Sequence, residues 1–248
     1  MLQPGAVVRY RAVVADVTLG CAVLVHGLWG NPEDWRWVAE LLERQGVQVR
    51  APDLPSHSST TKGVADDAEA VRQTIQSCQT PVVAVGWSYG GDVISVAAAN
   101  ESNVCRLVYV AAIPHSRTQE RFDQSWIEKD PLVRVSADGS FVLDNDLWLS
   151  QDDAVKTFPP DVLAHLRRHP RRWVSPGVDD PRTEASWESI PTTIIIGSED
   201  DLISDDDRAR ASGAFVDVQI LPTDHFIIFR YPEAVRDAVV RALEVGRE

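Results

Sequence analysis

The stretch G-W-S-Y-G at residues 86–90 places Ser88 between glycines, where one apolar run gives way to another. The run at 82–85 is continuously apolar, as in a strand buried on both faces, and the run that follows is typical of a helix rich in small residues. A strand-to-helix turn of this kind holds a serine hydroxyl above the sheet, where it can act as a nucleophile. The alternative is an ordinary glycine-rich turn, because the pentapeptide alone also arises by chance.

Two later loops contain residues that could activate this serine. A serine hydroxyl is a weak nucleophile at neutral pH, so it needs a base within hydrogen-bond reach and an acid that orients the base. His225 follows the apolar run 216–221 and is the expected base. Asp200 and Asp201 both follow the apolar run 192–197; we expect Asp200 to be the acid, with Asp201 as the second candidate.

The oxyanion that forms when a serine attacks a carbonyl needs two fixed hydrogen-bond donors. The peptide N–H of Tyr89, directly after the serine, is the expected first donor. The expected second donor is the N–H of Leu28, because the preceding Gly27 lets the H-G-L-W-G loop come close to the serine. His26, at the start of that loop, is expected to support the loop rather than take part in the chemistry.

The other histidines are assigned less demanding roles. His57 and His115 lie in loops at the ends of strands, so we expect them at the border of the pocket. His165 and His169 lie in an arginine-rich stretch and are expected on a solvated helix face. The basic R-R-H-P-R-R segment at 167–172 is likewise expected to be solvated surface, with attraction of an anionic acyl group as the alternative.

An acidic run follows the candidate acids. Asp205, Asp206 and Asp207 are expected to complement the dipole of a helix that Ser204 caps. A metal site is the alternative, but no histidine or glycine spacing supports it. We therefore expect neither a metal nor an organic cofactor.

Strand-like and helix-like stretches alternate along the chain, which predicts a parallel, doubly wound α/β sheet. An edge strand is predicted at 7–14, a short strand at 47–53, and buried strands at 21–26, 81–86, 104–112, 192–197 and 216–221. Helices are predicted at 32–45, 64–78, 91–100 and 231–245.

Residues 114–189 interrupt this alternation with four tryptophans and seven prolines. The stretch 133–143 predicts a β-hairpin around Asp138-Gly139, followed by short helices. We therefore expect a core formed by residues 1–113 and 190–248, with 114–189 inserted between two core strands.

The motifs H-G-L-W-G, A-P-D-L-P, G-W-S-Y-G-G, G-S-E-D and D-H occur in this order along nearly the whole chain. As a set they resemble the α/β-hydrolase superfamily. L-V-Y-V-A-A-I-P, W-x-x-I-P and T-D-H-F resemble its branch of methylesterases, hydroxynitrile lyases and their bacterial relatives. The resemblance implies the α/β-hydrolase fold, a Ser88–Asp200–His225 triad and a small cap formed by 114–189.

Some positions depart from the pattern of that family. Ser56 and Ser58 replace glycines of the usual D-L-P-G-H-G loop, and Ser204 replaces a common proline. In the lyase branch a lysine follows the catalytic histidine and a threonine follows the histidine of the first loop. Here those positions are Phe226 and Gly27, as in esterases.

The resemblance therefore implies a carboxylic ester hydrolase that uses a two-step acyl-enzyme mechanism. The alternatives are another triad reaction, such as that of a hydroxynitrile lyase or a cofactor-free peroxidase, and a non-catalytic ligand-binding protein. Trp29, Trp87, Trp126 and Trp148 are expected to line an apolar substrate pocket. The alternative is that the tryptophans of the insertion, Trp126 and Trp148, only supply its core. The sequence does not fix which ester is cleaved.

Composition narrows the class of partner. A net charge of −13 over 248 residues argues against nucleic acid and an anionic membrane as partners, but it says little about small neutral substrates. A small-molecule ester is the partner that the resemblance implies. Three cysteines without a C-x-x-C pair predict free thiols in a reducing compartment. With no apolar run near 18 residues, we expect a soluble cytoplasmic monomer or homodimer.

Overall fold

The computed structural model describes residues 7–9, 18–117, 121, 125 and 127–245. Over these residues the main sheet has seven strands in the order β1-β3-β2-β4-β5-β8-β9, and only β1 is antiparallel to its neighbour. The strands are β1 (Val7–Arg9), β2 (Gly20–Val25), β3 (Val47–Pro52), β4 (Val82–Trp87), β5 (Val104–Val110), β8 (Thr192–Gly197) and β9 (Asp217–Leu221). The predicted parallel sheet is confirmed; residues 10–14 of the predicted edge strand lie outside the described residues.

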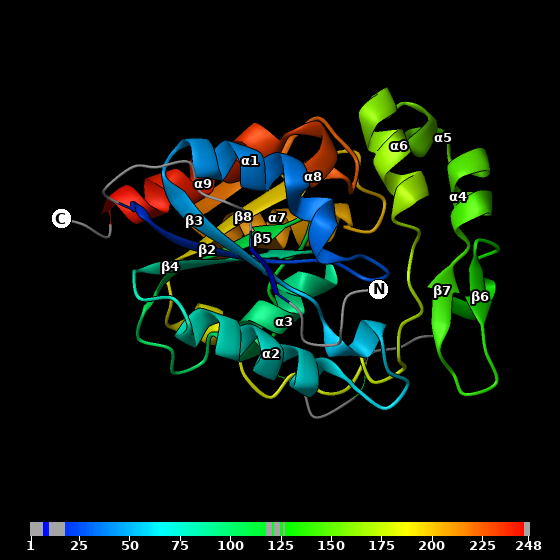
Figure 1. Ribbon diagram of the computed structural model, residues 1–248, viewed down its shortest axis with the longest axis horizontal. Helices are drawn as coiled ribbons and strands as arrows, with labels where there is room; N and C mark the ends of the chain where they lie inside the picture. Colours follow the sequence, from blue (N-terminus) through cyan, green and yellow to red (C-terminus); the bar gives the residue numbers. More distant parts are fainter. Residues whose placement is uncertain (1–6, 10–17, 118–120, 122–124, 126, 246–248) are drawn as a thin grey trace.

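Helices cover both faces of this sheet (Figure 1). They are α1 (Arg36–Arg44), α2 (Val64–Gln76), α3 (Tyr89–Ala97), α7 (Asp205–Ala214), α8 (Ile227–Arg230) and α9 (Pro232–Val245). Alternate residues of β2 enter different cores: Ala22 and Leu24 pack with α1 and α9, whereas Cys21 and Val23 pack with α2 and α3. Because both faces are covered, the strand is apolar at every position rather than at every second one.

Capping residues begin the helices where the sequence predicts them. Asn31 precedes the short 3-10 helix η1 (Pro32–Trp35), which leads into α1. The side chain of Asn31 accepts a hydrogen bond from the N–H of Glu33, and the side chain of Asp34 accepts one from the N–H of Asn31. Gly46, at φ 76°, ends α1. Ser204 caps α7 through the N–H of Asp207, which confirms its predicted role.

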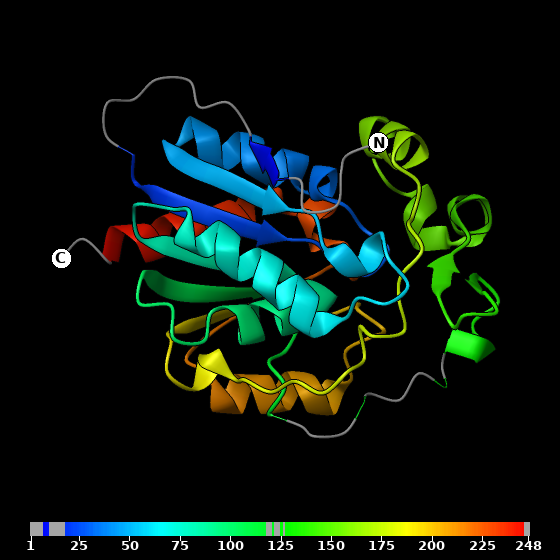
Figure 2. The ribbon, with the colours of Figure 1, turned by 60° about the horizontal axis from the view of Figure 1, so that its bottom comes forward.

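The segment 114–189 places residues 127–168 beside the carboxyl ends of the parallel strands, apart from the sheet, whereas its later residues return along the core and Ser186–Glu188 contacts α3 (Figures 1 and 2). It contains β6 (Val133–Val135), β7 (Phe141–Leu143), α4 (Asn145–Gln151), α5 (Asp153–Lys156) and α6 (Pro160–Arg168), with the 3-10 helices η3 (Ile127–Lys129) and η4 (Ser186–Glu188). β6 and β7 form the predicted hairpin, and Gly139 at φ 82° makes its turn possible.

A buried ion cluster joins this segment to the core. Asp34 is completely buried and accepts hydrogen bonds from both terminal nitrogens of Arg171 at 2.9 and 3.0 Å, while Nε2 of His165 lies 3.1 Å from it. The prediction of a solvated surface is therefore wrong for His165 and Arg171, although Arg167 and Arg168 are exposed. A carboxylate 137 residues away supplies the partner, which no local pattern reveals.

We expect Arg171→Met to lower the free energy of unfolding by about 3–5 kcal/mol at pH 7, because it leaves the Asp34 carboxylate buried without its main partner. The matched control is Arg168→Met on the exposed face of α6, which should have little effect. Urea denaturation measures both. Equal stability of the two variants would contradict a structural role for the Asp34–Arg171 pair.

The same cluster predicts a pH dependence of stability. Burial alone would raise the pKa of Asp34, but Arg171 and His165 together lower that pKa well below its usual range. The stabilisation is therefore complete above the unfolded-state pKa of about 4 and is lost as the pH falls further. Between pH 5 and pH 2, the wild type should lose more stability than Arg171→Met, as followed by thermal melts.

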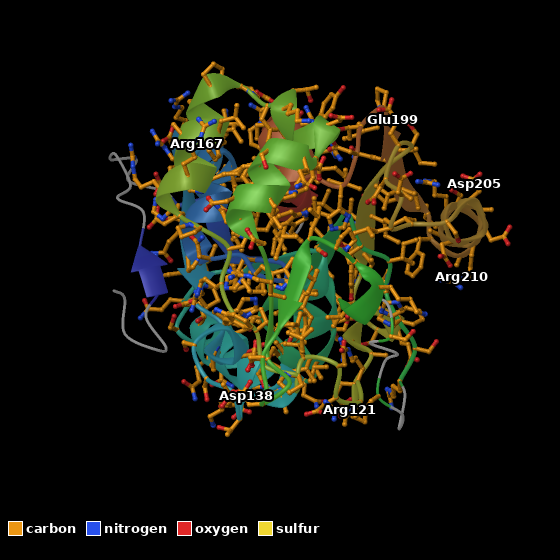
Figure 3. The ribbon with its side chains drawn as sticks, turned by 90° about the vertical axis from the view of Figure 1, so that its right-hand side faces the viewer. Arg121, Asp138, Arg167, Glu199, Asp205 and Arg210 are labelled. Carbon is orange, nitrogen blue, oxygen red and sulfur yellow. A yellow bond between two sulfur atoms is a disulfide. The ribbon has the colours of Figure 1, made fainter. Side chains whose placement is uncertain are left out.

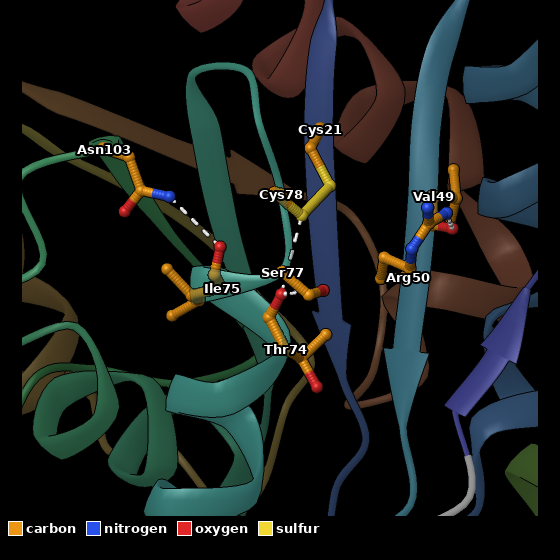
Figure 4. The surroundings of a disulfide bond; sticks show 8 residues. All are labelled: Cys21, Val49, Arg50, Thr74, Ile75, Ser77, Cys78 and Asn103. Carbon is orange, nitrogen blue, oxygen red and sulfur yellow. Dashed lines mark hydrogen bonds between the residues drawn. A yellow bond between two sulfur atoms is a disulfide. The ribbon is translucent and has the colours of Figure 1, made fainter.

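Two of the three cysteines form a disulfide, so the prediction of three free thiols is wrong (Figure 4). Cys21 on β2 and Cys78, just after α2, have Cα atoms 6.4 Å apart, whereas Cys105 is free. The expected reducing compartment was inferred from free thiols, and the disulfide removes that support.

Among the described helices, none combines the length and the apolar composition that crossing a membrane requires.

Candidate active site

Ser88 forms the turn between β4 and α3. Its backbone has φ 54° and ψ −124°, a conformation that costs a non-glycine residue on the order of 1–3 kcal/mol. The N–H of Ser88 donates to the carbonyl of Val110 at 2.9 Å, and its own carbonyl accepts from Gly91 at 2.8 Å, so both peptide groups are held. Its hydroxyl caps no N–H of α3, and the residue lines two cavities.

Glycines are required on both sides of this turn. A Cβ at Gly86 would meet the carbonyl of Gly90, and a Cβ at Gly90 would meet the carbonyl of Val25, each well under 3.0 Å. The turn can therefore form only if the chain lacks side chains at these two positions.

We expect Gly90→Ala to destabilise the fold by about 3 kcal/mol and to displace Ser88, because backbone atoms cannot move aside as a side chain can. The control is Gly213→Ala on α7, where an added Cβ meets nothing within 4 Å. That control should leave stability unchanged or raise it by up to about 1 kcal/mol. Urea denaturation of both variants measures the difference, and a Gly90→Ala protein as stable as Gly213→Ala would contradict the prediction.

His225 and Asp200 meet in the structure. Nδ1 of His225 lies 2.8 Å from Oδ2 of Asp200, which is 1% exposed, and the other carboxylate oxygen accepts from the N–H of Leu202 at 3.0 Å. Asp201 is exposed and, among the described residues, forms neither a hydrogen bond nor an ion pair with His225. Of the two candidate acids, the structure therefore brings Asp200 to the histidine.

The loops that carry this pair are packed together at the sheet edge. A Cβ at Gly197 would meet the carbonyl of Thr223, so glycine lets the loop after β8 lie against the loop after β9. Arg208 of α7 donates from Nε to the carbonyl of Gly197 at 3.0 Å and from a terminal nitrogen to the carbonyl of Asp200. Sequence reasoning missed Arg208, because it lies in a helix whose acidic first turn gave the stronger signal.

Trp87 holds the backbone of His225. Its indole N–H donates to the carbonyl of His225 at 3.0 Å, and the two rings lie 6.0 Å apart. Trp87 also borders the larger cavity, so this residue both shapes the pocket and fixes the loop of the candidate base.

Two cavities meet at Ser88, and Leu28, Leu202 and His225 line both of them. The larger, of about 570 Å³, is mainly apolar; its further lining includes Trp29, Trp87, Leu132, Leu143, Trp148 and Phe226. The smaller, of about 320 Å³, is more polar; Tyr89, Asp92, His115, Asp179, Arg182 and Arg210 help to line it. Figure 3 shows the molecule from the side of segment 114–189, with labels on Glu199, which lines the larger cavity, and on Arg210, which lines the smaller one.

Ion pairs organise the smaller cavity. Asp92 accepts from Arg182 at 2.9 Å and lies 2.8 Å from Nδ1 of His115, which holds the pKa of His115 above its usual value. Burial raises the pKa of Asp179 to about 6. Among the described residues, no group of three or more metal-binding side chains gathers as a metal site would require.

The other residues predicted to border the pocket were Trp29, Trp126, Trp148, His57 and His115. Trp29 and Trp148 border the larger cavity, and His115 borders the smaller. His57 borders neither, because it is 4% exposed and lies under Tyr89. Trp126 lies outside the described residues.

His26 holds the first loop, as expected. It is completely buried, its Nδ1 lies 3.0 Å from the carbonyl of Gly27, and its Nε2 accepts from the N–H of Leu54 at 3.3 Å. A Cβ at Gly27 would lie 3.1 Å from that of Ser88, so the loop that carries Leu28 does come close to the serine.

The fold and these motifs define an alpha/beta hydrolase. The model of the alpha/beta hydrolase family matches residues 22–238, and the chain belongs to this family. The superfamily predicted from the sequence is thereby confirmed.

Three similar proteins illustrate the range of this family. Pimeloyl-[acyl-carrier protein] methyl ester esterase of Aliivibrio fischeri is 32% identical over 114 residues, which cover 45% of this chain and 42% of that protein. The alpha/beta hydrolase nvfD of Aspergillus novofumigatus is 29% identical over 73% of this chain and 77% of its own. The methylesterase MES16 of Arabidopsis shares the fold with a TM-score of 0.68 at 16% identity, covering 91% of this chain and 99% of its own.

Proposed function

We propose that the protein is a serine hydrolase of small carboxylic esters, with Ser88 as nucleophile, His225 as base and Asp200 as orienting acid. The observation that carries the proposal is the 2.8 Å contact between the buried carboxylate of Asp200 and Nδ1 of His225. This contact leaves the other ring nitrogen for the serine, and Ser88 and His225 line the same two cavities. Relatives named as a methyl ester esterase and a methylesterase support the reaction class.

The reaction proceeds in two acyl-transfer steps. His225 takes the proton of Ser88 as Oγ bonds to the ester carbonyl carbon and the carbonyl electron pair moves onto oxygen. When the tetrahedral intermediate collapses, the carbon–oxygen bond to the alcohol breaks, and the alcohol leaves with the proton from His225. Water then attacks the acyl carbon by the same route, which releases the acid and returns the proton to Ser88.

The oxyanion is held by the N–H groups of Tyr89 and Leu28. Tyr89 is the first residue of α3, where an N–H has no partner within the helix and lies at the positive end of the helix dipole. Leu28 lies in the loop that Gly27 lets approach the serine. Each such donor contributes about 3–4 kcal/mol to transition-state stabilisation.

The larger cavity receives the apolar part of the ester. Trp29, Trp148 and Phe226 supply aromatic walls, and segment 114–189 acts as a cap over them. The smaller cavity, with its charged lining, receives the more polar part. Phe226 stands where the lyase branch carries lysine, so nothing at that position would hold cyanide.

A fluorophosphonate probe followed by mass spectrometry tests the proposal. We expect a single adduct on Ser88 in the folded protein and none in Ser88→Ala. A panel of p-nitrophenyl esters, with mandelonitrile included, should show ester hydrolysis without cyanide release. A folded protein that neither reacts with the probe nor hydrolyses any ester would overturn the proposed function.

A further inference from the structure

Beside the active site lies a buried carboxylate that the proposed mechanism does not use. Asp67, in the first turn of α2, is completely buried. It accepts three hydrogen bonds: from the N–H of Ser56 at 2.9 Å, from the hydroxyl of Ser56 at 2.6 Å and from the phenol of Tyr89 at 2.7 Å. Asp67 therefore links the loop after β3 to the residue that follows the candidate nucleophile.

The chain of hydrogen bonds continues to His57. The hydroxyl of Ser56 gives its one proton to Asp67, so Nδ1 of His57, 2.9 Å from that hydroxyl, must be the donor. Burial holds the pKa of His57 well below its usual value, so the ring is neutral. His57 therefore donates to the hydroxyl of Ser56, which donates to Asp67, and the phenol of Tyr89 donates to the same carboxylate.

Stability alone gives no reason for this network. Burial raises the pKa of Asp67, and within the described part of the chain no lysine or arginine forms an ion pair with it. A buried carboxylate held only by neutral donors is less favourable than well-packed apolar side chains of similar volume. What the network does is fix the phenol of Tyr89.

Tyr89 is held at both ends. Its backbone belongs to the Ser88 turn, its ring is 6% exposed between His57 and the guanidinium of Arg182, and its hydroxyl is bound by Asp67. A tyrosine side chain has only two torsions between backbone and ring, so anchoring the hydroxyl restrains the peptide group as well. Oxyanion donors are effective only when held to within about 0.5 Å of their working position.

We propose that Asp67 is a positioning residue that acts through the phenol of Tyr89 to fix the peptide N–H of Tyr89 in the oxyanion hole. Ser56, a serine where the family's loop usually has glycine, completes the arrangement by directing two donors at the same carboxylate. This inference depends on the proposed function, since it assigns a support to that site.

Tyr89→Phe tests the inference, because it removes only the hydroxyl. We expect kcat for a p-nitrophenyl ester to fall about 10-fold while KM changes less than about twofold, since the oxyanion forms only in the transition state. Ki for phenyl trifluoromethyl ketone, whose carbonyl oxygen becomes an oxyanion when Ser88 adds to it, should rise by the same factor. Asp67→Asn should likewise lower kcat and raise Ki. The double variant Asp67→Asn/Tyr89→Phe should have a kcat no lower than that of the poorer single variant, because both changes break the same hydrogen bond.

Tyr109→Phe is the matched control. Tyr109 is completely buried in the same core, and its hydroxyl lies 2.6 Å from that of Ser95, but it borders neither cavity. It should lower the melting temperature and leave kcat and Ki within about twofold of the wild type, because no oxyanion donor depends on it.

The outcomes separate the two proposals. An active wild type with an unaffected Tyr89→Phe, or an equal loss of kcat in Tyr109→Phe, would overturn the positioning role alone. A wild type that hydrolyses no ester would overturn the proposed function and this inference with it. If Asp67→Asn fails to fold, the comparison of Tyr89→Phe with Tyr109→Phe still decides.

Discussion

Ser88→Ala is expected to lower kcat for p-nitrophenyl acetate by at least about 10³-fold, because no acyl-enzyme can form without Oγ. The residual rate would come from the oxyanion donors and the bound substrate alone. The substitution should preserve the fold, since the hydroxyl of Ser88 caps no helix N–H, although alanine at φ 54° keeps the strain of the turn. Initial rates, together with a melting curve, measure the two effects separately.

A buried serine on α3, the helix that follows Ser88, provides the control for Ser88→Ala. Ser95 is 2% exposed and lies outside both cavities, and its hydroxyl contacts the carbonyl of Gly91 and the phenol of Tyr109. Ser95→Ala should lower the melting temperature while leaving the rate within about twofold of the wild type. If Ser88→Ala retained the wild-type rate, the chemistry would have to lie elsewhere.

The central strands were predictable because burial on both faces makes their sequences largely apolar. The runs at 21–26 and 192–197 correspond to β2 and β8 within one residue at each end. The start of α3 was less predictable: glycines at 90 and 91 indicated a turn, so the predicted helix began at 91 whereas α3 begins at Tyr89. Gly90 allows close contact with the backbone of Val25, and Gly91 leaves room for the side chains of Tyr109 and Ala112, so neither glycine is there for flexibility.

The order of the triad loops was also predictable, because parallel strands deliver their carboxyl ends to one edge of the sheet. What the sequence left open was the choice between neighbouring acids. Asp200 and Asp201 differ in burial, which depends on how the loop after β8 packs against the loop after β9. No local pattern records that packing.

Long-range polar pairs account for most of what was missed. Asp34 meets Arg171, and Asp67 meets Tyr89, across separations of 137 and 22 residues. In each pair both residues are charged or polar, and such residues are usually exposed, so a surface position was the natural expectation for the basic segment. The disulfide between Cys21 and Cys78 was missed for a related reason: sequence spacing does not reveal which cysteines meet.

Asp200→Asn is expected to lower kcat by about 10³–10⁴-fold, whereas Asp201→Asn should stay within about threefold of the wild type. An asparagine at 200 can present its amide N–H to Nδ1 of His225, which favours the tautomer whose Nε2 carries a proton and cannot accept one from Ser88. The variant also leaves the imidazolium without a carboxylate. Asp201 is exposed, so its amide analogue changes only one solvated charge at the rim of the larger cavity.

Parallel measurement of kcat for the two asparagine variants, with the fluorophosphonate labelling rate of Ser88 as a second readout, tests this assignment. Both readouts should fall together in Asp200→Asn, because each requires His225 to accept the serine proton. The two variants carry the same change in charge and lie one residue apart, so a nonspecific electrostatic effect would act on both alike. A larger loss in Asp201→Asn would mean that the loop after β8 rearranges during catalysis and delivers the other carboxylate to the histidine.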